Sequence, residues 1–400
     1  MKRVVVTGIS TLTSLGETEE TWLGLQNNQS SFSPLPDEWS KYGTYRTKQA
    51  AFVTKEIPSS SRTDRFVDLG LACAREALKD ADLDPSSLNP FRLGIITGTA
   101  GGGNSTLEQQ VNELLTHGTH RIHPLTVPKA MIGSLSGHLA ALYKAKGPNV
   151  TISTACSSAN HAIGIAFETI QLGKADVIIT GGSESPMTPG VFASFDNVRA
   201  MAPEDDLCTP FSKTRKGFLL GEGAAILIVE ELEMARSRGA KIYAEIVGYS
   251  ATSDGFHMVM PDPNGEAVAY TMSQSIKQAG LSVDEIDQIN AHGTGTLAGD
   301  KSESLGVKQV FGKLASQIPI SSIKGAVGHT LGASAAIEAV ISMLSLRDGI
   351  LIPTVNCNAP DETLGLNVTM ATEKIDSLQT ILSNSFGFGG NNSSLLFRKL

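Results

Sequence analysis

Short apolar runs alternate with longer segments of helical pattern along the whole chain. The runs are rich in β-branched residues and bounded by Gly or Pro, which is typical of buried strands; they are Arg3–Thr7, Leu93–Thr97, Val150–Thr154, Val177–Thr180 and Ala224–Val229. The longer segments predict helices over Phe66–Leu78, Ala159–Leu172 and Gly265–Ala279. This alternation predicts an α/β fold with largely buried sheets.

The order of these segments repeats within the chain. Phe66–Gly103 reads as helix, short turn, strand and Gly/Thr-rich turn, and Val268–Thr296 has the same order. Ile152–Ile170 and Ser321–Leu344 both read as strand, turn and Ala-rich helix. Two matches in the same order predict a duplicated chain whose halves meet near residue 245. We therefore expect an N-terminal half over 1–245 and a C-terminal half over 246–400.

Composition narrows the class of protein. Charged residues make up only 18% of the chain, which suggests that much surface is removed by compactness or subunit association. The formal net charge of −8 argues against a nucleic-acid binder. No apolar run approaches the roughly 20 residues of a membrane span. Met1 to Val6 superficially resembles a signal peptide, but Thr7 and Gly8 interrupt it, so we expect a first strand there.

Cysteine usage points to a reducing compartment. The chain has four cysteines and no C-x-x-C pair, so it carries no disulfide framework and no thiol metal motif. We expect a cytoplasmic protein. No H-E-x-x-H is present, and we expect no metal.

One cysteine has a setting suited to chemistry. Cys156 stands where a predicted strand ends and a predicted helix begins. Unpaired helical N–H groups and the positive end of the helix dipole there favour the thiolate, which is the nucleophilic form. The alternative is a small buried hydrophobic residue. Cys73, Cys208 and Cys357 lack this context, and we expect them to be inert.

Two of the eight histidines follow strands in the same manner. His292 begins the run His292–Thr296, and His329 lies between a predicted strand and an Ala-rich helix. Under the duplication, both lie at the same end of their sheets as Cys156. Ligands gather at the carboxyl ends of strands in open α/β sheets, so one shared site is the better explanation.

Two glycine-rich turns complete the set. Gly98–Gly103 follows a strand, but it does not spell G-x-G-x-x-G, so we do not expect a dinucleotide site. Phe386–Asn392 lies near the C-terminus, and its glycines permit close backbone approach to a ligand.

These motifs together resemble the β-ketoacyl-acyl-carrier-protein synthases, the elongating type I/type II ketosynthases, and are closest to type II. The matching segments are Thr154–Ala159, His292–Thr296, Lys324–Gly332 and Phe386–Gly390, and the likeness runs from Arg3–Gly8 to Leu395–Phe397. The resemblance implies a thiolase-like fold of two βαβαβαββ halves in five αβαβα layers.

The resemblance also implies a reaction and its residues. Cys156 is expected to take an acyl group from a carrier protein, and His292 and His329 to stabilise the enolate formed when malonyl-carrier protein loses CO₂. Lys324 is expected to support His329, with Glu338 and Asp300 as its partners. Further residues implied are Phe388 for the oxyanion hole and gate, Thr294 and Thr296 for the pantetheine arm, Gly101 and Phe195 for the acyl pocket, and Arg62, Arg121 and Arg199 for carrier docking.

Partners follow from the same likeness. The implied partner is an acyl carrier protein whose phosphopantetheine holds the substrates, and no separate cofactor is implied. We expect a homodimer, or a heterodimer with a paralogous subunit. Two departures from the family pattern stand out: Gly101 occupies a position where many type II relatives carry Ile, and Ser212–Gly217 differs from the usual acidic loop.

Other functions remain as alternatives at this point. A thiolase acting on coenzyme A thioesters needs a second C-terminal cysteine, and Phe386–Asn392 has none. A non-elongating partner subunit lacks the nucleophile, whereas Cys156 is present. Type III synthases use Asn where His329 stands, and an initiating decarboxylase replaces the cysteine by Gln. The sequence leaves open whether the pathway makes fatty acids or specialised polyketides or polyenes.

Overall fold

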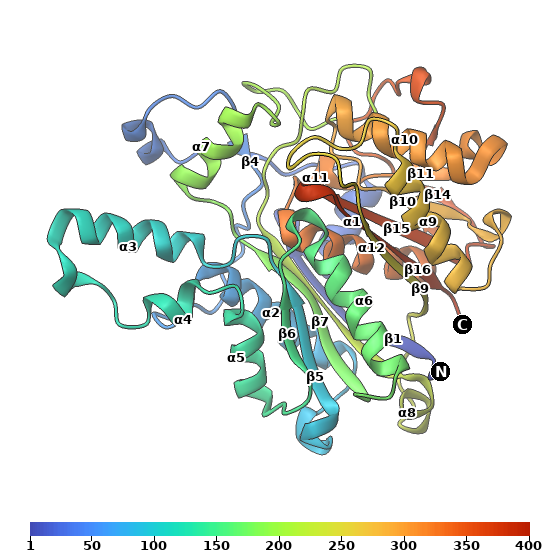
Figure 1. Cartoon of the computed structure of the whole chain (residues 1–400), viewed down its shortest axis with the longest axis horizontal. Helices are drawn as coiled ribbons and strands as arrows, with labels where there is room; N and C mark the ends of the chain where they lie inside the picture. Colours follow the sequence, from blue (N-terminus) through green and yellow to red (C-terminus); the bar gives the residue numbers. More distant parts are fainter.

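The computed structural model describes residues 1–400 and contains two half-sheets of the same design (Figure 1). The first half-sheet has the order β6 (Asn149–Ile152), β5 (Leu93–Gly98), β7 (Val177–Glu184), β8 (Gly223–Glu231), β1 (Val4–Thr13). Strands β6, β5 and β7 run parallel, and β8 and β1 are antiparallel to their neighbours.

The second half-sheet repeats this order and these directions. It consists of β11 (Pro319–Ser321), β10 (Gln288–Asn290), β15 (Thr380–Gly387), β16 (Asn391–Arg398) and β9 (Ala244–Ser253). Strands β11, β10 and β15 are parallel, and β16 and β9 are antiparallel. The predicted duplication is therefore confirmed. Val4–Val6 of β1 pair with β9, which joins both half-sheets into one hydrogen-bonded sheet.

Helices complete five layers. Helices α2 (Arg65–Asp80) and α5 (Ser134–Tyr143) cover the outer face of the first half-sheet, and α9 (Glu266–Gln278) and α10 (Leu297–Phe311) cover that of the second. Helices α6 (Ser158–Gln171) and α12 (Ser334–Asp348) lie between the two half-sheets. The α/β thiolase-like architecture expected from the sequence is confirmed.

The central layer explains the Ala-rich helix seen in the sequence. Residues 334–346 of α12 are all buried. A helix that is covered on every side must be apolar or small all round, because each face meets another element. Alanines and serines let both half-sheets approach α12 closely.

Most predicted elements match, with one correction. The predicted helices correspond to α2, α6 and α9, and the predicted strands to β1, β5, β6, β7 and β8. The prediction that Val150–Thr154 is buried is wrong: β6 ends at Ile152 and is the edge strand, and Val150 is 42% exposed. Its free side carries no neighbouring strand to cover it.

Several helices lie outside the layers. Helices α3 (Asn104–His117) and α4 (Thr126–Ala130) project as an arm beside β6 and α5 (Figure 1). Helix α7 (Pro189–Val198) lies next to α3, and the N–H of Gly190 donates to Glu108. The remaining short helices are α1 (Thr18–Gln26), α8 (Leu232–Ser237) and α11 (Lys324–Val327). None of the helices is long and apolar enough to cross a membrane. The boundary predicted near residue 245 falls within β9 and stays a prediction.

The remaining strands are short. Strand β13 (Asn367–Val368) extends the sheet beyond β11, and β2 (Gly16–Glu17) pairs with β1. Two further pairs lie apart from the main sheet: β3 (Ser33–Pro34) with β4 (Gln49–Ala50), and β12 (Ile350–Leu351) with β14 (Glu373–Lys374).

Candidate active site

Cys156 lies in a tight turn between β6 and α6. A single 3-10 turn, Ala155–Ser157, joins the strand to the helix, and Ala155 takes a left-handed backbone with φ of 52°. The Ser158 hydroxyl accepts the N–H of Thr154 at 2.9 Å and closes the turn. This sharp strand-to-helix corner holds the sulfur in a fixed place, as a nucleophile elbow does.

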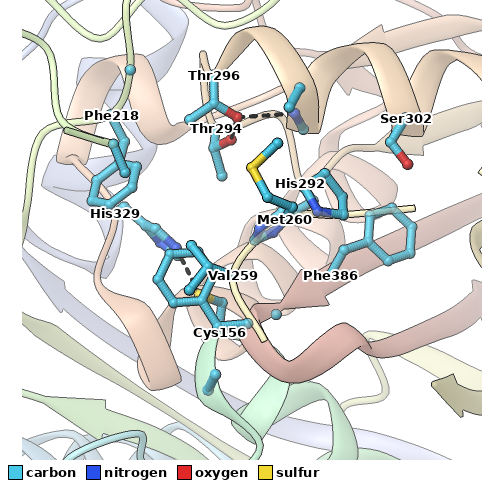
Figure 2. A pocket seen from close by; sticks show the side chains of 18 of the residues that line it. Cys156, Phe218, Val259, Met260, His292, Thr294, Thr296, Ser302, His329 and Phe386 are labelled. Carbon is cyan, nitrogen blue, oxygen red and sulfur yellow. Dashed lines mark hydrogen bonds between the residues drawn. The ribbon is translucent and has the colours of Figure 1, made fainter. Parts of the chain in front are cut away.

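Two histidines from the other half meet this sulfur (Figure 2). His329 Nε2 lies 3.1 Å from Cys156 Sγ, and the rings of His292 and His329 have centroids 5.5 Å apart. One donor atom from each of the three residues lies within 4.8 Å of the others. The predicted shared site of one cysteine and two histidines is therefore confirmed.

Burial decides the resting charge of the thiol. It raises the pKa of Cys156 to about 11, more than the charge of Lys324 and the N–H groups of Phe388 and Cys156 lower it. The helix-end N–H groups act in the expected direction, but they are outweighed by the loss of water around the sulfur.

Both imidazoles are neutral. Burial, followed by the positive charge of Lys324, lowers the pKa of His292 and of His329 well below the ordinary value; the charge of His329 adds to this at His292. A neutral imidazole has one N–H donor and one lone pair, so each ring can donate a hydrogen bond to a developing anion.

Lys324 is a buried cation beneath the histidines. Its ammonium group donates to the backbone oxygen of His292 at 2.5 Å and forms a short ion pair with Glu338. Both side chains are only 1% exposed. Glu338 therefore contacts Lys324, as the sequence predicts. Their ion pair holds the ammonium group close to both imidazole rings.

Asp300 has a different place from the one expected. Its carboxylate accepts the N–H groups of Phe211 at 2.7 Å and Gly295 at 3.0 Å, and the Arg215 guanidinium lies 3.6 Å away. It makes no hydrogen bond to Lys324. Burial raises its pKa to about 6, although these hydrogen bonds and the charges of Arg215 and Lys324 lower it. Asp300 thus fixes the Thr294–Thr296 loop rather than Lys324.

Glu303 was not predicted from the sequence. Its carboxylate accepts the backbone N–H groups of His292 at 2.9 Å and Gly293 at 2.8 Å. It lies on α10, 11 residues after His292 in the chain, and no local motif marks it. Burial raises its pKa to about 7 against these two hydrogen bonds. This contact sets the backbone from which His292 projects.

The glycine-rich turn near the C-terminus faces the sulfur. Phe388 lies between β15 and β16, and its backbone N–H is one of the groups that lower the pKa of Cys156. Its ring stacks on Phe195 with centroids 6.3 Å apart, and Phe195 meets Phe218 edge-on. Both predicted aromatic residues, Phe388 and Phe195, line the cavity above Cys156.

That cavity has a volume of about 360 Å³ and leads from Cys156 to the surface. Thr294 and Thr296 line it and lie 2.9 Å apart through their hydroxyl oxygens (Figure 2). Val259 and Met260 form part of the opposite lining and are 39% and 52% exposed.

Gly101 does not line this cavity, whereas its neighbour Ala100 does. The N–H of Gly101 donates to buried Glu184 at 3.0 Å, and a Cβ at position 101 would meet the Asn104 side chain at 2.2 Å. Its predicted role at the floor of an acyl pocket stays a prediction.

The three predicted docking arginines are exposed. Arg199 lines the cavity, whereas Arg62 and Arg121 lie outside it. None of the three forms an ion pair with a carboxylate in the structure, unlike Lys216 at the same mouth, which lies 2.9 Å from Asp206. Their charges are therefore not compensated by a carboxylate of the same chain, and their role in docking stays a prediction.

The other cysteines lie outside the site. All four cysteines are free, and burial raises the pKa of Cys73 and Cys208 to about 12 and that of Cys357 to about 11. The one group of three residues with metal-ligand spacing is Cys156, His292 and His329. Those three residues also line the cavity described above, so the spacing alone does not call for a metal.

Comparison with known proteins gives the family. Residues 1–235 match the model of the β-ketoacyl synthase N-terminal domain, and residues 243–358 match that of the C-terminal domain. The 3-oxoacyl-[acyl-carrier-protein] synthase 2 of Coxiella burnetii is 38% identical over 100% of this chain and 99% of its own length. The enzyme of the same name from Vibrio cholerae is 36% identical with the same coverage.

Solved structures of ketosynthases have the same fold over the whole length of this chain. A β-ketoacyl synthase from Burkholderia phymatum has a TM-score of 0.92 at 32% identity, with both chains covered completely. The ishigamide ketosynthase/chain length factor has a TM-score of 0.93 at 30% identity, covering 100% of this chain and 99% of the other. A type II polyketide synthase acyl-carrier protein in complex with its hexaketide-bound ketosynthase has a TM-score of 0.92 at 31% identity, with complete coverage of both chains.

Proposed function

The chain belongs to the β-ketoacyl synthase family, and from that premise we propose that it is a 3-oxoacyl-[acyl-carrier-protein] synthase. The reaction is the decarboxylative Claisen condensation of malonyl-carrier protein with an acyl group held on Cys156. The observation that carries this proposal is Cys156 Sγ at 3.1 Å from His329 Nε2, with His292 beside it at the base of a cavity.

In the first step Cys156 attacks the acyl thioester of the carrier protein. The new bond joins Sγ to the acyl carbon, the bond to the pantetheine sulfur breaks, and the thiol proton ends on the departing pantetheine thiol. The backbone N–H groups of Cys156 and Phe388 point toward the sulfur and can bind the oxygen of the tetrahedral intermediate.

In the second step malonyl-carrier protein loses CO₂. The electrons of the broken C–C bond pass to the thioester, whose oxygen becomes negative. Neutral His292 and His329 can each donate an N–H to that oxygen in a dry site, where such bonds are strong. Lys324 favours the neutral rings because its positive charge would repel the charge of a protonated imidazole.

In the third step the enolate carbon attacks the acyl-cysteine. The carbon–carbon bond forms, the bond from the acyl carbon to Sγ breaks, and the lengthened 3-oxoacyl chain remains on the carrier. Sγ leaves as a thiolate and takes up one proton from solvent, which restores the resting thiol. The backbone N–H groups of Cys156 and Phe388 can again bind the oxygen of the tetrahedral intermediate. Phe388, stacked on Phe195, acts as the gate between the cavity and the acyl pocket.

We propose an acidic acyl carrier protein as the partner. Exposed Arg62, Arg121 and Arg199 supply positive charge although the chain carries a net charge of −8. Thr294 and Thr296 line the path of the pantetheine arm. One of the solved relatives described above is a ketosynthase bound to its carrier protein, which supports this choice.

We propose a homodimer, with a heterodimer as the second candidate. The support is the open edge of β6 and the apolar side chains exposed beside it on α3, α4 and α5. A ketosynthase/chain length factor relative at 30% identity favours the heterodimer, but that arrangement needs a paralogous chain. Cys156 within reach of His329 supports a catalytic subunit over a non-elongating partner. The four free cysteines support a cytoplasmic location.

The test is acyl loading measured by intact-protein mass spectrometry. The chain is incubated with acyl-carrier proteins of saturated, unsaturated and polyketide type, which also separates the candidate pathways. We expect loading on wild type and none on Cys156→Ala, with Cys208→Ala as the matched control that still loads. Removal of one buried sulfur should change the melting temperature by only a few degrees, since about 1 kcal/mol is typical of such changes. Acyl adducts on Cys156→Ala would refute the assignment.

A further inference from the structure

The two histidines of the site differ in the hydrogen-bond partner of their Nδ1 atoms. His329 Nδ1 lies 2.9 Å from the hydroxyl oxygen of Ser334, which lies 3.0 Å from that of Thr330. These three residues are 1%, 3% and 1% exposed. His292 Nδ1 is buried and has no hydrogen-bond partner.

A short segment builds this arrangement. Thr330 follows His329, the 3-10 turn Leu331–Ala333 comes next, and Ser334 begins α12. The N–H of Ala333 donates to the backbone oxygen of Thr330 at 3.0 Å, which brings both hydroxyl groups to the same side. The segment therefore carries the imidazole and the two groups that contact its rear nitrogen.

The direction of this hydrogen-bonded chain follows from its donors. Each hydroxyl has a single hydrogen, and a neutral imidazole has a single N–H. If Nδ1 donated to Ser334 and Ser334 to Thr330, the buried hydrogen of Thr330 would have no acceptor, because its only side-chain partner is Ser334. If Thr330 donates to Ser334 and Ser334 to Nδ1, every hydroxyl hydrogen is used. An unpaired buried donor is costly, so the second direction is favoured.

We propose that Ser334, with Thr330 behind it, fixes His329 in the tautomer that carries its proton on Nε2, the nitrogen facing Cys156 Sγ. In this tautomer His329 is a permanent donor toward the sulfur and toward an enolate oxygen, and it does not take the thiol proton. Ser334 is a positioning residue, since it touches His329 and not the reacting atoms. The inference rests on the proposed function and adds the reason why His329 presents an N–H group at Nε2.

The first test reads the tautomer in the resting enzyme, without substrate. Long-range proton–nitrogen correlation spectra of ¹⁵N-histidine-labelled protein distinguish a protonated from an unprotonated ring nitrogen, and His329→Gln assigns the signals. We expect Nε2 protonated and Nδ1 unprotonated in wild type, and a mixture of tautomers in Ser334→Ala. A protonated Nδ1 in wild type, or unchanged His329 signals in Ser334→Ala, would overturn the proposal.

The second test separates positioning from packing. Ser334→Ala should slow malonyl decarboxylation about 10-fold, the rate equivalent of one lost hydrogen bond, while acyl loading stays near wild type. Thr330→Val should give a smaller loss, and Ser334→Thr, which keeps the hydroxyl, should recover much of the rate. Ser345→Ala, a buried serine farther along α12, is the matched control with an unchanged rate.

The outcomes of the two tests are distinguishable. Equal losses in Ser334→Ala and Ser334→Thr, with an unchanged spectrum, would mean that the site only needs the volume of serine, which overturns the proposal. An enzyme without decarboxylase activity but with the expected spectrum would refute the proposed function and leave the tautomer assignment standing.

Discussion

Single side chains in this site act through charge held away from water. Lys324 and Glu338 form an ion pair at 1% exposure, and the ammonium also contacts the backbone of His292. Because no solvent screens it, one cation influences Cys156, His292 and His329 together. Substitution of Lys324 should therefore change both the pKa values of the two histidines and the free energy of unfolding, and each effect can be measured on its own.

The pH dependence of decarboxylation should reflect neutral histidines. Burial first and Lys324 second hold the pKa of both rings well below 6.5, so the active neutral form persists as the pH falls through that value. We expect a flat rate from about pH 7.5 to about pH 6, across the ordinary pKa of histidine. Lys324→Met removes the repelling charge and raises both pKa values, which moves the acidic loss of rate to higher pH. Steady-state rates across pH, with exposed Lys301→Met as control, check this. A wild-type loss centred near pH 6.5 would contradict it.

The same substitution should destabilise the fold. Removal of one partner from a buried ion pair leaves the other charge uncompensated, which typically costs about 3–5 kcal/mol. Lys324→Met should lose that much free energy of unfolding in urea, and adding Glu338→Gln should recover part of it. Equal stability of the single and double variants would show that the pair is not coupled.

At the scale of elements, the Phe388 turn is tied to the loop that forms the cavity mouth. The N–H of Gly389 donates to Met258 at 2.8 Å, and the N–H of Asp254 donates to Gly390 at 2.9 Å. Gly389 and Gly390 have φ of 78° and 72°, which other residues rarely adopt. The position of Phe388 above Cys156 thus depends on two adjacent glycines.

Gly390→Ala should slow both acyl loading and condensation. A Cβ at position 390 would lie 2.8 Å from Asp254 Cβ and 2.9 Å from its backbone nitrogen, so the turn must shift. A displacement of about 1 Å near reacting groups can cost about 100-fold in rate. Gly280→Ala has φ of 70° and open space around it, and it measures the effect of backbone strain alone. Equal kcat/KM values for the two variants would contradict the expected role of the turn.

The elements that sequence could predict are those that bury a face. Strands and the central helices show their apolar pattern. Cys156 and His292 closely follow the ends of β6 and β10, whereas helix α11 separates His329 from the end of β11. Helix α3 buries only Thr106, and α7 only Phe192 and Asp196, so neither shows a core-facing stripe. The contacts of Glu303 and Ser334 depend on how turns orient a backbone, which local spacing does not specify.

The whole molecule is a duplicated chain in which the sheet ends at an uncovered edge strand, β6. The two half-sheets have the same order, and the edge strand β6 of the first carries exposed Val150. The arm of α3 and α4 and the neighbouring helix α5 expose a group of apolar side chains: Leu107, Val111, Leu114, Leu115, Val127 and Leu142. An apolar surface next to an open strand edge is typical of a protein interface.

Sedimentation should therefore find a dimer that Val150→Lys converts to a monomer. An antiparallel pairing of two β6 edges would continue the sheet across a two-fold axis, and stable interfaces bury about 1,200–2,000 Å². A lysine on an edge strand opposes such pairing because its charge would be buried against its own copy. Tyr270→Lys, at an exposed aromatic residue of α9 in the other half, introduces the same charge away from the edge and should leave the dimer intact. Acyl loading measured on both variants separates assembly from chemistry. A wild-type monomer at micromolar concentration, or a Val150→Lys dimer, would place the interface elsewhere or remove it.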